Sequence, residues 1–176
     1  MAITINGSGT ITGISAGGLP DGSVTAADIA SLPAGSVLQV VQGGTNTSTA
    51  ITSTSYQDTT LSASITPTNS SSKILIIVSQ AGHVYATTSS NRWAYMRIMR
   101  DSTEVHAVTQ ALGGRGALSG DRSDTASVSL TYLDSPSSTS TLTYKTQAKI
   151  NDSASANYTA QVSESESTIT LMEIAG

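Results

Sequence analysis

Residues 56–86, YQDTTLSASITPTNSSSKILIIVSQAGHVYA, contain the strand signals that decide the fold class. Leu61, Ala63 and Ile65 alternate with polar residues, which is typical of a strand with one buried face. Residues 67–72, PTNSSS, are turn formers. Residues 73–86 form an almost continuous apolar run, so we expect a strand that is buried on both faces. This stretch predicts a β protein.

Further strand signals recur at short intervals. Residues 92–108 and 126–150 each have the pattern of a hairpin, with turns at 101–103 and 134–140. Roughly eight or nine strands separated by turn clusters are typical of a sandwich. We therefore expect an all-β fold, an antiparallel β-sandwich or jelly roll. Shorter strands are expected at 36–42, 157–163 and 167–174.

The first 35 residues differ from the rest of the chain in composition and in the length of their apolar segments. They are rich in Gly, and their apolar pieces are each too short to bury a face alone. Two alternatives stay open: three parallel copies wound into a short stem, or a tail that becomes ordered on its docking partner. We expect a stem or attachment segment at 1–35 and a β-sandwich head domain at 36–176.

Composition indicates an ordered protein with a thin core. The net charge is −4 and 38% of residues are hydrophobic, whereas disordered chains combine low hydrophobicity with high net charge. Ser and Thr together fill about a third of the positions. The chain has six Tyr, one Trp and no Phe, so a monomeric core would rely on smaller side chains. We expect an oligomer in which subunit contacts supply part of the burial.

Several kinds of function are disfavoured. The absence of cysteine excludes disulfides, thiolate metal sites and cysteine nucleophiles. No segment reaches the roughly 18 consecutive apolar residues of a membrane span, so we expect no membrane insertion. The first ten residues lack the basic and apolar regions of a secretion signal, so we expect folding in a cytoplasm. Lys and Arg are not clustered, so we expect no nucleic-acid partner.

Four segments of the sequence are similar to segments of a known group of proteins: MAITINGSGTITGI, SLPAGSVLQVVQ, SYQDTTLSASITPTNSSSKILIIVSQAG and STITLMEIAG. They resemble predicted tail-fibre and related structural proteins of marine and freshwater phages, cyanophages in particular. The resemblance covers nearly the whole chain, and SSKILI and TITLMEIAG are its most specific parts. It implies a trimeric virion component, made in the host bacterial cytoplasm, with an N-terminal attachment segment and a β-sandwich head. It leaves tail, baseplate and capsid open and assigns no functional residue.

Catalysis is the weaker interpretation. His83 and His106 are the chain's two histidines, and each is expected to be an ordinary strand or rim residue. A histidine metal site would need neighbouring strands or a symmetry axis. Closely spaced carboxylates are usually solvated surface, and glycosidase chemistry also needs a cleft. We expect no enzyme, no catalytic residue, no metal and no cofactor. The carboxylate pairs are Asp121 with Asp124, and Glu164 with Glu166, the latter expected on one strand face.

Binding is the stronger interpretation. Trp93 and Tyr95 lie two residues apart, so a strand would place them on one face, with Arg97 next along it. An exposed aromatic ring beside an arginine can stack on a sugar; the alternative is that Trp93 anchors the core or a subunit interface. A second candidate is the long loop expected at 111–125, which either contacts a glycan or protein epitope or is merely solvated. Its candidate residues are Arg115, Asp121, Arg122 and Asp124.

These observations lead to one main expectation and two alternatives. The main expectation is a homotrimeric fibre or spike subunit of a bacteriophage, bound to other virion proteins through residues 1–35. Its head would display multivalent contacts to a host-surface glycan or protein. The first alternative is a capsid decoration or cement protein. The second is a polysaccharide depolymerase, which is usually longer and built on a repeat that this sequence lacks.

Overall fold

A computed structural model of the chain describes residues 32–86, 92–114, 122–152 and 156–176, and Ala34–Gly176 form one compact unit. The predicted N-terminal segment, 1–35, lies outside the described residues except for its last four. No helix in the described part of the chain is long and apolar enough to cross a membrane. The strands are β1 (Val37–Thr45), β2 (Thr49–Ile51), β3 (Gln57–Ile65), β4 (Lys73–Ala86), β5 (Arg92–Arg100), β6 (Thr103–Gly114), β7 (Arg122–Asp134), β8 (Leu142–Ile150), β9 (Ala156–Ala160) and β10 (Ser167–Ile174), with a 3-10 turn, η2 (Val162–Glu164).

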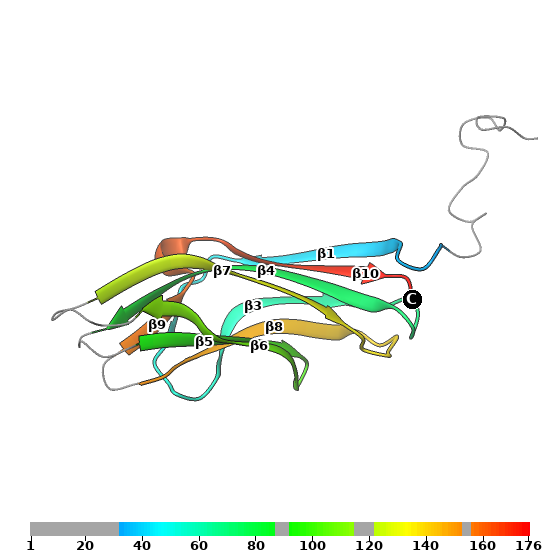
Figure 1. Cartoon of the computed structure of the whole chain (residues 1–176). Helices are drawn as coiled ribbons and strands as arrows, with labels where there is room; N and C mark the ends of the chain where they lie inside the picture. Colours follow the sequence, from blue (N-terminus) through cyan, green and yellow to red (C-terminus); the bar gives the residue numbers. More distant parts are fainter. Residues whose placement is uncertain (1–31, 87–91, 115–121, 153–155) are drawn as a thin grey trace, which may run out of the picture. The chain divides into compact units, whose positions relative to one another are not determined.

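The strands form two antiparallel sheets that lie over one another as two layers (Figure 1). Sheet A places β1, β10, β4 and β7 side by side. The long strand β4 pairs with β10 along its first half and with β9 along its second half, and β2 pairs with β9. Sheet B has the order β3, β8, β5, β6. The predicted antiparallel β-sandwich is therefore confirmed.

The order in which the strands pair is that of a jelly roll. The pairs are nested along the chain: β1 with β10, β3 with β8, β4 with β7, and β5 with β6. Pairing of β10 with β4 and of β8 with β5 then joins these four ribbons into two sheets. A folded-over antiparallel ribbon of eight main strands is the jelly-roll arrangement.

The core lies between the sheets and follows the alternation of the strands. In β8, Leu142, Tyr144, Thr146 and Ala148 are buried while the residues between them are half-buried, as the sequence predicts for one face. Tyr144 and Tyr158 are the largest fully buried side chains. They supply the aromatic bulk that Phe would otherwise provide.

Two strand predictions were wrong. Strand β4 is buried on one face only, because Ser79 is exposed and Ile77 retains 39% of its accessible surface. Residues 126–150 are not a hairpin, because β7 pairs with β4 in sheet A and β8 pairs with β3 and β5 in sheet B. The connection at 135–141 therefore crosses from one sheet to the other.

Two boundaries also differ from expectation. The predicted loop at 111–125 is shorter, because β6 continues to Gly114 and β7 begins at Arg122. The predicted strand at 157–163 ends at Ala160, after which Gln161 adopts a left-handed conformation with φ of 52° and the chain enters η2. The predicted hairpin at 92–108 is confirmed as β5 and β6, which turn at residues 101 and 102.

A carboxylate is buried in sheet A, and no salt bridge to it occurs among the described residues. Glu173 in β10 is fully buried, and its Oε2 accepts a hydrogen bond of 2.6 Å from Gln39 Nε2. Its Oε1 accepts bonds from the backbone nitrogen of Thr68 at 2.7 Å and from Thr68 Oγ1 at 2.8 Å. Burial pushes the pKa of Glu173 upward, but these hydrogen bonds outweigh burial and hold the pKa below its ordinary value of 4.5.

This arrangement predicts an acid-sensitive contribution to stability. Because the folded pKa of Glu173 is depressed, its contribution is fully present above pH 4.5 and is lost as the pH falls through the folded pKa. The variant Glu173→Gln is therefore expected to be less stable than the wild type at pH 7, by a margin that shrinks below pH 4.5. Urea midpoints measured across this range check the prediction, and a margin independent of pH would contradict it.

Candidate functional site

The outer face of sheet B brings together the aromatic residues that the sequence singled out. Trp93 and Tyr95 lie in β5 between residues that point into the core, since Ala94 and Met96 are fully buried. Both aromatic side chains are half-buried and share the outer face with Arg97, as expected for a strand. Trp93 is not part of the core cluster, so it does not anchor the core. Its role in binding stays a prediction.

A lysine lies between two tyrosines on this face. Lys149 in β8 is the direct cross-strand partner of Tyr95 in β5, and its Nζ is 5.3 Å from the centre of the Tyr95 ring. The same Nζ is 4.8 Å from the centre of the ring of Tyr56, the residue that immediately precedes β3. We call these three residues, Tyr56, Lys149 and Tyr95, the tyrosine–lysine row. Contacts of a cation with an aromatic ring are worth about 0.5–1 kcal/mol at exposed sites.

A second row of polar side chains runs beside the first. Arg97 donates to Glu104 Oε2 through Nη1 at 2.8 Å and to Gln147 Oε1 through Nε at 2.8 Å. Gln147 Nε2 donates to Asp58 Oδ1 at 2.7 Å, and Lys145 Nζ pairs with Asp58 Oδ2 at 2.9 Å. Burial alone would raise the pKa of Asp58, but the bonds from Lys145 and Gln147 outweigh it and lower the pKa.

The cations of this face differ in how their charges are compensated, and Lys145 is paired with Asp58. The Arg97 guanidinium is paired with Glu104, and it also lies 4.0 Å from the centre of the Tyr56 ring. Burial, and then the nearby Glu104 charge, raise the pKa of the Tyr56 hydroxyl, so Tyr56 is neutral at physiological pH. Among the described residues, no carboxylate forms an ion pair with Lys149. Lys149 is therefore the group on this face that can accept an anionic ligand.

The second predicted site falls largely outside the described residues. Arg115 and Asp121 lie in the part of the chain that the structure does not describe. The backbones of Arg122 and Asp124 belong to β7, where they pair with Ala86 and Val84 of β4. These positions are in sheet A, whereas Trp93 and Tyr95 are in sheet B. The loop residues and the aromatic residues thus come from different sheets, and the loop's role stays a prediction.

The histidines lie in opposite sheets and have ordinary partners. His83 lies within β4 in sheet A, and its Nε2 is 2.6 Å from Ser123 Oγ. His106 in β6 of sheet B stacks on Tyr132, with 5.1 Å between the ring centres. No group of three metal-ligating side chains occurs among the described residues. Residues 13–17, GISAG, match the G-x-S-x-G spacing of a hydrolase nucleophile, and they lie outside the described residues.

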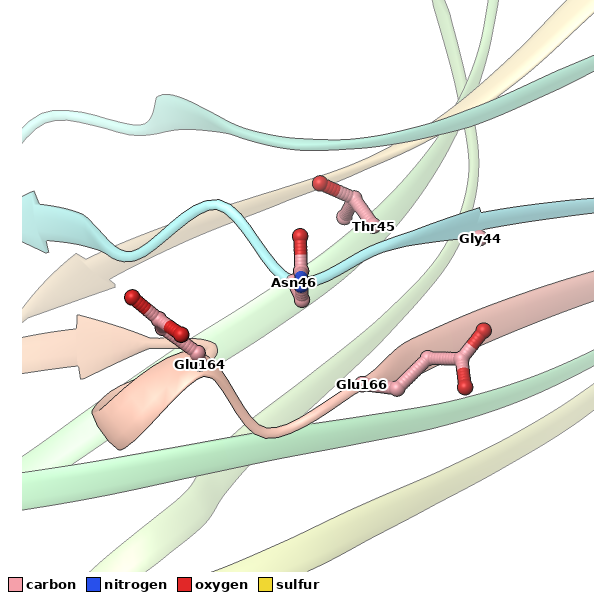
Figure 2. Close-up of a pocket in the computed structure, with 5 residues that line it drawn as sticks. All are labelled: Gly44, Thr45, Asn46, Glu164 and Glu166. Atoms are coloured by element: carbon pink, nitrogen blue, oxygen red, sulfur yellow. The ribbon is translucent and has the colours of Figure 1, made fainter.

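An open pocket of about 640 Å³ lies at the junction of β1 and η2 (Figure 2). Glu164 belongs to η2 and Glu166 precedes β10, so the prediction that they share a strand face was wrong. Both side chains are exposed, and Figure 2 shows their carboxylates pointing away from each other. The pocket offers neither a buried acid nor an aromatic wall for a sugar, so we assign it no chemistry. Its lining residues are Gly44, Thr45, Asn46, Glu164 and Glu166.

Sequence reasoning missed two of the three residues of the tyrosine–lysine row, Tyr56 and Lys149. The alternation of residues 142–150 places Lys145, Gln147 and Lys149 on the face opposite the core, which was a usable signal. What the sequence does not contain is the register that sets Lys149 against Tyr95 and brings Tyr56 to the same place. Those neighbours come from three strands that are far apart along the chain.

Comparison with known proteins identifies no family. No protein-family model matches the chain, and no curated protein sequence matches it significantly. Solved structures of infectious bursal disease virus show a distant likeness. A structure of the Gt strain has 12% identity and a TM-score of 0.36, over 80% of this chain and 39% of that chain. The crystal structure of the VP2 subviral particle of this virus has 12% identity and a TM-score of 0.35. This chain thus spans 39% of the length of each.

Proposed function

We propose that the chain is a structural subunit of a bacteriophage particle, a homotrimeric fibre or spike protein whose jelly-roll head takes part in attachment to the host surface. It acts by binding and not by catalysis. The observation that carries the proposal is a row of apolar side chains on the outer face of sheet A, which the described part of the chain leaves partly or largely exposed.

The row crosses four strands in direct register. Val40 in β1 is opposite Met172 in β10, Met172 is opposite Leu75 in β4, and Leu75 is opposite Leu133 in β7. We call these four residues the apolar row. Val40 and Leu133 retain 56% and 47% of their accessible surface. Because neighbouring strands lie about 4.8 Å apart, the row spans roughly 14 Å. Exposed Ile77 lies in the next row of the same face.

The outer faces of the two sheets differ in character. Sheet B exposes charged and hydrogen-bonded side chains, among them Asp58, Arg97 and Lys145. Sheet A exposes the apolar row and, beside it, the hydroxyls of Thr131 and Thr170 opposite Ile77. A contiguous apolar patch on an otherwise polar surface marks a contact with another protein. The thin, Phe-free core supports the view that further copies of this chain cover it.

The remaining parts of the proposal rest on the sequence. The resemblance to tail-fibre proteins supports a place in the virion and an attachment segment at residues 1–35, which would bind other virion proteins. The polar face of sheet B stays free in this arrangement. Three copies on one rigid head would then present it three times, which can raise avidity by about 10² to 10⁴ without new contacts.

The location of the protein in purified particles tests this function. Gold-labelled antibodies against the head are expected to mark the tail, baseplate or another projecting fibre or spike in electron micrographs. Labelling spread in high copy over the capsid shell would instead indicate a decoration protein. Absence of the protein from purified particles would contradict the proposal altogether.

A further inference from the structure

We infer that the outer face of sheet B binds an acidic saccharide, with Lys149 meeting the carboxylate of the sugar and the rings of Tyr95 and Trp93 packing against its apolar face. This inference deepens the attachment role proposed above and rests on it only for the biological setting. The binding site itself is defined by contacts between described residues.

The Lys149 ammonium lies close to two aromatic rings. It is held 4.8 Å from the centre of the Tyr56 ring and 5.3 Å from that of the Tyr95 ring, and no described carboxylate pairs with it. Lys149 can therefore donate hydrogen bonds to a ligand at a position that the two rings define. A charge-assisted bond of this kind is about twice as strong as a neutral one.

Two aromatic side chains of β5 lie on the same face as the lysine. Tyr95 and Trp93 occupy alternate positions of β5 and are both partly exposed on the same face. Aromatic rings provide large, rigid contact surfaces, and sugars have one face of C–H groups that can lie against them. The ligand must therefore combine a flat, weakly apolar face with an anionic group. Hexuronic acids and other carboxylated sugars have this combination.

Arg97 is not the anion-binding group of this face, because its guanidinium already has partners. The guanidinium of Arg97 is already engaged with Glu104, Gln147 and the Tyr56 ring. A ligand carboxylate at Arg97 would have to displace Glu104. The network instead fixes the position of Tyr56, which in turn borders Lys149. Arg97 is thus a positioning residue.

A pair of matched saccharides tests the inference. The purified full-length protein is titrated by calorimetry with a tetramer of galacturonic acid and with the neutral galactose tetramer. The acidic tetramer is expected to bind at least about tenfold more tightly, and the difference to shrink as salt screens the charge. Equal affinities, or no binding of either tetramer at millimolar concentration, would overturn the inference.

Variants locate the site. Lys149→Gln is expected to weaken binding of the acidic tetramer by about tenfold and to leave the neutral one unchanged, while Tyr95→Ala weakens both. Lys73→Gln removes an equal charge from the outer face of sheet A and is expected to bind like the wild type. An unaffected Lys149→Gln variant refutes the site. Binding of a glutamate-rich peptide, but of neither saccharide, refutes the ligand class.

These outcomes are separate from those that test the proposed function. Saccharide binding is measured on protein of known solution mass, and it can fail in a protein that is trimeric and part of the virion. Conversely, a monomeric protein that binds the acidic tetramer through Lys149 would retain the inference and lose the trimer.

Discussion

Replacing Gly82 by alanine is expected to destabilise the fold by about 3 kcal/mol, at the upper end of the range for overpacked cores. A Cβ atom on Gly82 would lie 2.3 Å from Cε2 and 2.4 Å from Oη of Tyr158. Tyr158 is fully buried between the sheets and has no room to withdraw. Strand β4 is paired on both sides here, with β7 and β9, so the backbone cannot shift either. Chemical denaturation followed by circular dichroism measures the loss.

Gly44→Ala is the matched control for this substitution. Gly44 also lies in a strand of sheet A, but its added Cβ would meet only the Oε1 atom of Glu166, at 3.1 Å, and atoms farther away. Because Glu166 is exposed and flexible, the expected cost is under about 1 kcal/mol. In a double-mutant cycle, Tyr158→Leu should recover part of the cost of Gly82→Ala. Equal stability of Gly82→Ala and the wild type would show that the packing around Tyr158 is wrong.

Replacing Asp134 by alanine is expected to cost about 3 kcal/mol, the lower end of the range for breaking a buried charge pair, because the Arg100 side chain is 21% exposed. Asp134 Oδ2 accepts bonds from Arg100 Nη1 at 2.5 Å and from the Tyr144 hydroxyl at 2.7 Å. The carboxylate of Asp134 is 8% exposed and Tyr144 is fully buried, so the substitution leaves a cation and a hydroxyl without their acceptor. Burial, and then the bond to Asp134, raise the pKa of Tyr144, which keeps its hydroxyl protonated as a donor.

The exposed ion pair of Asp58 with Lys145 provides the comparison. Asp58→Ala removes a carboxylate with bonds to Lys145 and Gln147, but its side chain is 53% exposed, so the expected cost is about 0–1 kcal/mol. Unfolding midpoints in urea measure both variants. If Asp134→Ala cost no more than Asp58→Ala, the interaction of Asp134 with Arg100 and Tyr144 would not be a stabilising feature of the core.

The fold could be predicted from the sequence as far as strand alternation reaches. Residues 57–65 and 142–150 alternate cleanly, and both are strands with one buried face. Strand β4 was misjudged because Leu75 and Ile77 are apolar although they lie on the outer face. An apolar residue that contacts another subunit cannot be distinguished in the sequence from an apolar residue that is buried within its own chain. The sequence therefore predicted the apolar character of this face of β4, but not that the described part of the chain leaves it partly exposed.

Pairing and site geometry depend on register, which local patterns do not contain. The Ser-rich segment 134–140 is as compatible with a crossover between sheets as with a hairpin turn, so the prediction that β7 pairs with β8 was wrong. The shared face of Trp93, Tyr95 and Arg97 followed from spacing within one strand. The contribution of Tyr56 and Lys149 required the alignment of β3, β8 and β5. The spacing of residues within one strand predicts which of them share a face. Which residues of other strands lie beside them depends on the tertiary structure.

The apolar row can be tested by one substitution. Leu133→Lys places a charge at one end of the apolar row, within the proposed subunit contact, while it should leave the single chain folded because Leu133 is already 47% exposed. The variant is expected to dissociate into monomers with an unchanged circular dichroism spectrum. Ser64→Lys, on the exposed outer face of sheet B, adds the same charge and is expected to retain the wild-type mass. Dissociation of both variants, or of neither, would argue against the apolar row as the contact.

The most direct measurement is the solution mass of the purified full-length protein by light scattering coupled to size-exclusion chromatography. We expect a mass of three times 17.9 kDa, with sheet A of each subunit covered by its neighbours. A monomer of 17.9 kDa that leaves the apolar row in water would contradict it.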